Sequence, residues 1–85
     1  MDVLTLQRWL AQAEDFVRQG EKHLSRQRNL VERMERSGHD AGLARDLLAI
    51  FEEWQIAHLA HRDRLRRELA LTEDATIRFG KPTRP

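Results

Sequence analysis

Apolar and small residues recur at alternating spacings of three and four through the first half of the chain. The positions are Val3, Leu6, Leu10, Ala13, Val17, Gly20, Leu24, Gln27, Val31 and Met34. Within this series Gln27 alone is polar, and Gly20 has no side chain. This spacing is the a/d heptad of a coiled coil, so it predicts one long helix over about residues 2–36. Asp2 is suited to cap the first turn of that helix.

A second column of large side chains runs beside this series at sevenfold spacing. It consists of Trp9, Phe16, His23 and Leu30. The two columns together make an apolar face about half the helix circumference wide, which is more than a two-helix seam requires. This width predicts contact with more than one other helix.

A short break, Ser37–Asp40, separates the first run from a second run of similar length. Gly38 is suited to the left-handed position that follows a helix end, and Asp40 is suited to the N-cap of the next helix. The break therefore predicts a tight turn, and the fold class expected is all-α, an antiparallel two-helix hairpin of long, coiled-coil-like helices.

The second run predicts a helix over about residues 41–71, followed by a C-terminal tail over 72–85. The main apolar stripe of this helix is expected on Leu43, Leu47, Ile50, Phe51, Trp54, His58, His61, Leu65 and Leu69. A weaker patch is expected round the side, on Leu48, Ile56 and Leu59. The hairpin domain as a whole would then cover residues 1–71.

The turn also predicts the register of the hairpin. Facing positions are expected to add up to about 77 in an antiparallel pair with this turn. Met34 is then expected to meet Leu43. Gly20 and His23 are expected to lie opposite Trp54, with His58 one turn further along.

The apolar surface left over predicts association of two hairpins into a four-helix bundle. A lone hairpin buries one stripe on each helix, and leaving the rest in water favours association. The residues expected at this interface are Trp9, Phe16, Leu30, Leu48, Ile56 and Leu59. A homodimer is the expected state, and an unidentified protein partner is left open.

Length and composition narrow the function classes. The chain has 85 residues, which is enough for one small domain, and it contains no cysteine, which excludes disulfides and thiol chemistry. Charged residues make up 34% of the chain but the net charge is +1, a balance typical of solvated helix faces. No basic leader with an apolar run opens the sequence, and no apolar stretch is long enough to span a bilayer. A cytoplasmic location without membrane contact is therefore expected.

Three histidines are the candidate metal ligands. His58 and His61 lie one turn apart on the same helix, and the register brings His23 toward them from the first helix. Imidazoles from facing helices suit zinc, so a histidine-based metal or small-ligand site is one alternative function. The ordinary alternative is that these side chains are half-buried packing residues that hydrogen-bond to nearby glutamines or water.

The densest basic stretch is 62–67, with further cations beyond it. Weak nucleic-acid binding through this end is a second alternative function. Pairing with acidic residues such as Asp63 and Glu14 explains the same residues without a ligand, and aromatic residues are not interleaved with the arginines. No nucleophile–base arrangement or phosphate-binding glycine loop appears, so a non-enzymatic interaction protein is expected.

Several segments together are similar to a known group of sequences. They are Gly20–His23, Arg26–Arg28, Ser37–Asp40, Leu47–Leu48, Phe51–Glu53 and His58–Asp63. They resemble short uncharacterised helical proteins of proteobacteria, particularly soil and plant-associated alphaproteobacteria, over about residues 7–69. The resemblance implies a bacterial origin, and it carries no catalytic residues to transfer.

Overall fold

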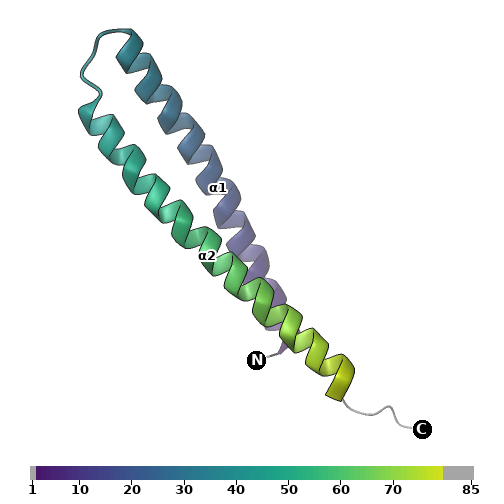
Figure 1. Ribbon diagram of the computed structural model, residues 1–85. Coiled ribbons are helices and arrows are strands. Elements are labelled where there is room, and N and C mark those ends of the chain that lie inside the picture. Colours follow the sequence, from purple (N-terminus) through teal and green to yellow (C-terminus); the bar gives the residue numbers. More distant parts are fainter. Residues whose placement is uncertain (1, 80–85) are drawn as a thin grey trace.

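The computed structural model describes residues 2–79 as two helices, α1 (Val3–Arg36) and α2 (Gly42–Phe79). They lie side by side along their length and are joined by a short turn at one end (Figure 1). The expected all-α helical hairpin is therefore present, and the described part of the chain contains no strand.

The turn closes with hydrogen bonds of the Schellman type. Gly38 has φ +74°, the left-handed conformation that glycine adopts without a steric cost. The His39 N–H donates to the Met34 carbonyl at 2.9 Å and the Gly38 N–H donates to the Glu35 carbonyl at 3.2 Å. At the start of α2, Asp40 Oδ1 accepts from the Gly42 N–H at 2.9 Å. These bonds satisfy backbone groups at both helix ends and fix the reversal of the chain.

The face of α1 that packs on α2 is the heptad series of the sequence. Its buried residues are Leu6, Ala13, Val17, Leu24, Gln27 and Val31, all of which belong to that series. Asp2 caps the helix by accepting from the Thr5 N–H at 2.7 Å. The pattern of the first half of the chain thus determines both the start and the buried face of α1.

The face of α2 that packs on α1 differs from the expected stripe. A series of buried and half-buried residues recurs by threes and fours from Ala41, directly before the helix, through Ala44, Leu48, Phe51, Gln55, His58, Arg62, Leu65, Leu69 and Thr72. Leu43 is 83% exposed and Trp54 is 58% exposed, so the prediction that these side chains lie in the stripe facing α1 was wrong. The most apolar stripe of α2 is rotated away from α1, and the seam is filled by smaller and more polar residues.

Two apolar clusters mark the register. Near the open end, Leu6 and Ala13 pack with Leu65. Near the turn, Val31 packs with Ala41 and Ala44, and Met34 and Leu48 lie against this cluster. Met34 therefore packs on this cluster rather than on Leu43, which the sequence predicted as its neighbour. The alignment agrees with the expected sum of about 77, because each apolar cluster joins positions close to that value.

Two buried glutamines link the helices between the apolar clusters. Nε2 of Gln27 donates to the Ala44 carbonyl and Nε2 of Gln55 donates to the Val17 carbonyl, both at 2.9 Å. Gly20 makes room for Gln55, because a Cβ at residue 20 would overlap its side-chain amide. A buried amide that finds its partner in a single alignment disfavours slippage of one helix along the other.

The second helix is longer than the sequence suggested. It runs to Phe79 rather than ending near residue 71, and its last turns extend past the start of α1 (Figure 1). Leu71 and Ile77 in this extension are 71% and 83% exposed. The first part of the expected tail is therefore helical, and residues 80–85 lie outside the described residues.

Candidate functional site

One long side of the hairpin is lined by three ion pairs between the helices. They join Glu35 to Arg45, Arg28 to Glu52 and Glu14 to Arg66. On each helix these residues are separated by seven or fourteen positions, so they form one column per helix. We call this the ion-paired side.

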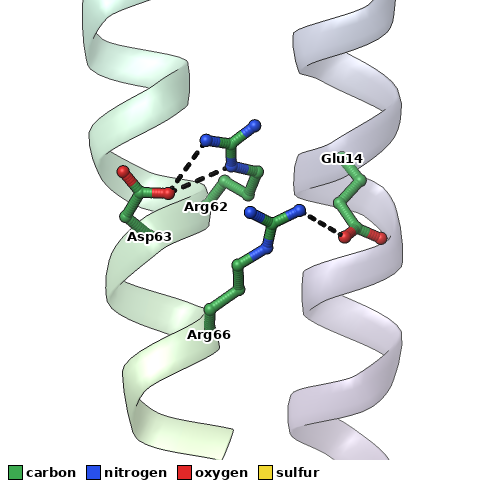
Figure 2. A network of polar contacts seen from close by, with 4 residues as sticks. All are labelled: Glu14, Arg62, Asp63 and Arg66. Carbon is green, nitrogen blue, oxygen red and sulfur yellow. Dashed lines mark hydrogen bonds and ion pairs between the residues drawn. The ribbon is translucent and has the colours of Figure 1, made fainter.

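Figure 2 shows the part of this side nearest the open end, with Glu14 on α1 and three residues of α2. The Arg66 guanidinium donates to Glu14 Oε2 at 3.1 Å, and Arg62 donates to its neighbour Asp63 at 3.0 and 3.1 Å (Figure 2). The basic stretch of α2 therefore meets carboxylates within the hairpin, as the sequence indicated.

The opposite long side is apolar. It carries the sevenfold column of α1, and on α2 a second column together with an isoleucine beside it: Trp9, Phe16, His23, Leu30, Leu47, Ile50, Trp54 and His61. We call these residues the apolar side. Contacts show that the two columns share one side, because Phe16 and His23 line one hollow with Trp54 while Trp9 lines another with His61.

The side chains of the apolar side are packed only in part. Trp9, Phe16 and Leu30 are 46%, 44% and 37% exposed, and Leu47, Ile50 and Trp54 are 40%, 42% and 58% exposed. Apolar side chains in the core of a folded domain usually have an exposed fraction close to zero. A contiguous exposed apolar patch of this kind is typical of an interaction surface.

A hollow of about 470 Å³ lies on the apolar side between the helices. It is lined by Phe16, Gln19, Gly20, His23, Phe51, Trp54, Gln55 and His58. Five of these residues carry rings, and neither an acidic side chain nor a lysine or arginine is among the lining residues that the structure describes.

The rings of the hollow pack on one another across the seam. Phe16 and His58 are stacked with centroids 5.8 Å apart and planes 26° apart. His23 lies 6.1 Å from Phe51, which in turn lies 5.8 Å from Trp54. Such contacts hold the walls of the hollow in a defined arrangement, because ring pairs at these separations attract one another.

The predicted metal ligands are divided between two places. His23 and His58 line the hollow, while His61 lies with Trp9 in the neighbouring depression nearer the open end. Within residues 2–79, no group of three or more His, Cys, Asp or Glu side chains could hold a metal ion. The first two imidazoles pack on phenylalanine rings, and the zinc site stays a prediction.

The predicted interface residues separate into three groups. Trp9, Phe16 and Leu30 lie on the apolar side. Leu48 packs into the seam against the cluster of Val31, so its assignment to an outer patch was wrong. Ile56 and Leu59 lie toward the ion-paired side, since Ile56 is four residues from Glu52 and Leu59 is seven residues from both Glu52 and Arg66.

Sequence reasoning assigned Leu47, Ile50 and Trp54 to the seam, and the structure places them on the apolar side. A signal was present: the second half of the chain contains two heptad series, one that starts at Ala41 and Ala44 and one through the larger residues. The predicted stripe followed the larger residues, whereas the structure packs the series that begins with the two alanines against α1.

Comparison of the chain with protein-family models, with curated proteins and with solved structures gave no match. The resemblance to short proteobacterial helical proteins therefore stays a prediction. Among the described residues, neither helix is long and apolar enough to cross a membrane.

Proposed function

We propose that this protein is a non-enzymatic interaction module that self-associates through its apolar side, with two hairpins forming a four-helix bundle. The observation that carries the proposal is the row of large, partly exposed side chains along one side of the hairpin. Water contact with such a row is unfavourable, and a second hairpin offers an equivalent row.

The amount of exposed apolar surface fits this proposal. An aromatic side chain has roughly 150–250 Å² to bury. At the exposed fractions of Trp9, Phe16 and Trp54, with the aliphatic residues of the same side added, the apolar side leaves roughly 500 Å² of apolar surface in water. A stable interface buries about 800 Å² on each partner, of which somewhat more than half is apolar. The row is therefore large enough for a dimer.

The distribution of charge supports the same side as the interface. Burying a charge without a partner costs several kcal/mol, so charge-poor surfaces associate at the lowest cost. The ion-paired side already uses its carboxylates and guanidinium groups within one hairpin. In the described part of the chain, the hollow at the middle of the apolar side is lined by no Asp, Glu, Lys or Arg, and charged residues such as Arg64 and Glu68 line the depression beside Trp9.

A matched pair of variants tests the proposal. Ile50 lies on the apolar side and Ile56 lies toward the ion-paired side of the same helix, with 42% and 67% exposed surface. Ile50→Glu is expected to weaken the dimer about 30-fold or more, the effect of losing one interface hot spot. Ile56→Glu is expected to leave the dimer unchanged.

Sedimentation equilibrium between low micromolar and hundreds of micromolar protein measures the dimer dissociation constant of each variant. Circular dichroism of each variant shows whether the helices persist. A wild-type protein that sediments as a monomer at every concentration would contradict the proposal. Equal weakening by the two glutamates would contradict the choice of side. A cytoplasmic location, weak nucleic-acid binding and an additional protein partner stay predictions.

A further inference from the structure

The hollow occupies the middle of the hairpin. Its wall includes Gly20, which lies halfway along α1 (Val3–Arg36), and on α2 it extends from Phe51 to His58. Large side chains of the apolar side continue beyond it in both directions, with Leu30 and Leu47 toward the turn and Trp9 toward the open end. A partner hairpin laid along the apolar side would therefore cover the hollow with its own middle section.

The chemistry of the hollow selects an uncharged, ring-bearing occupant. The lining consists of aromatic and imidazole rings, two glutamine amides and a glycine. No carboxylate or guanidinium among the described lining residues is available to pair with a charged group. Ring edges and faces favour another aromatic ring, and a volume of about 470 Å³ is ample for an indole.

Trp54 is the aromatic residue best placed to fill this space from a second copy. It is the most exposed aromatic side chain of the apolar side, at 58%, and it lines the hollow itself. In a two-fold dimer the same patch is used on both chains. A residue at the centre of the patch then meets the centre of the patch on the partner.

This result does not depend on which two-fold arrangement is adopted. If the two hairpins point the same way with full overlap, Trp54 of the second copy stands level with His23 and Gly20. If they point in opposite directions with the axis at the middle of the hairpin, it stands near His58 and Phe16. All four of these residues line the hollow.

We infer that the hollow on each hairpin receives Trp54 of the second copy, so that two indoles interlock at the centre of the four-helix bundle. The inference rests on the proposed self-association and names the residue at its centre. It assigns to Trp54 the largest single contribution to the dimer and to Trp9 a smaller, peripheral one, because central and fully desolvated residues dominate interfaces.

The 85-residue chain allows a direct test, because it contains two tryptophans. Trp9→Phe leaves Trp54 as the single reporter, and Trp54→Phe leaves Trp9. For each variant, emission and acrylamide quenching are followed as protein concentration is raised through the dimer range found by sedimentation. In the Trp54 reporter the emission should move to shorter wavelength, and quenching should fall by about twofold or more as a half-exposed ring becomes buried.

Alanine variants supply the second measurement. Trp54→Ala should raise the dissociation constant about 30-fold or more, the size of an interface hot spot. Trp9→Ala should raise it by less. Ile56→Ala is the control for loss of an exposed apolar side chain away from the apolar side.

The outcomes separate the inference from the proposed function. A dimer in which Trp54 keeps its exposed emission, or in which Trp9→Ala costs more than Trp54→Ala, overturns the inference and leaves self-association standing. A chain that stays monomeric throughout overturns both. A third outcome also overturns the inference. In it, Trp54 becomes buried only when another protein or an apolar molecule is added, and no dimer forms.

Discussion

The two long sides of the hairpin flank the same seam but carry opposite chemistry. On one side, carboxylates and guanidinium groups of α1 and α2 pair across the seam at three levels. On the other, at the levels between Trp9 and Leu30, rings and aliphatic side chains stand half exposed. The ion-paired side is therefore closed by contacts within one hairpin, whereas the apolar side leaves large side chains partly in water.

The contrast also shows where free energy remains to be gained. The ion pairs are exposed, with side chains such as Glu14 and Arg66 at 36% and 51%, and exposed pairs contribute about 0–1 kcal/mol each. Apolar area contributes about 25 cal/mol for each Å² removed from water. A second hairpin thus gains far more on the apolar side than on the ion-paired side.

The largest effect is expected from making the apolar side resemble the ion-paired side. Leu30 and Leu47 stand at the same level, so Leu30→Glu with Leu47→Arg introduces a pair like Glu35–Arg45. We expect loss of two apolar contacts from the dimer and a dissociation constant raised about 100-fold or more. Sedimentation measures the dimer, and circular dichroism should show a monomer that stays helical. A double variant that still dimerises like the wild type would contradict the contrast between the sides.

A smaller effect is expected inside the seam, where Gly20 meets Gln55. Gly20→Ala raises helix propensity by about 1 kcal/mol. We nevertheless expect a net loss of about 1–3 kcal/mol, because the new Cβ overlaps the buried amide of Gln55 and disturbs its bond to Val17. Urea unfolding at fixed protein concentration measures the change.

A double-variant cycle with Gln55→Ala serves as the control. Removing the amide should abolish most of the penalty of Gly20→Ala, so the two changes should be strongly non-additive. Additive effects would show that the glycine is needed for another reason.

Breaking one exposed ion pair should change the free energy of unfolding still less. Glu14→Gln, Arg66→Gln and the double variant form a cycle whose coupling energy should lie between about 0 and 1 kcal/mol and should shrink in 1 M salt. None of the three is expected to alter the dimer. Coupling well above this range would contradict the assignment of this pair as an ordinary exposed ion pair.

The smallest effect concerns the helix cap at the start of α1. The Thr5 backbone N–H bonded to the Asp2 carboxylate lowers the pKa of Asp2 below its ordinary value. A lowered folded pKa means that the stabilisation is present above the unfolded pKa, near 4, and is lost as pH falls through the folded value. NMR titration of Asp2 and of the Thr5 amide should show the depressed pKa and a common midpoint. Asp2→Asn, which can cap without titrating, should remove this pH dependence.

Much of the fold could be predicted because the controlling signals are local. The heptad series of α1, the glycine at residue 38 and the cap at Asp2 each act within a few residues. The register then follows from the geometry of the turn. The end of α2 was predicted near residue 71, whereas the backbone continues as one helix through Glu73 and Asp74 to Phe79.

The sequence by itself determined that this chain forms two long helices and reverses at Gly38, since periodicity and turn chemistry are properties of neighbouring residues. It also determined that more apolar surface is present than one hairpin can bury. Only the tertiary structure decided which of the two stripes of α2 faces α1. That choice depends on how the side chains of the two helices fit together. Ala41 and Ala44 pack against Val31 near the turn, and Gly20 leaves room for Gln55, whereas Trp54 stays 58% exposed.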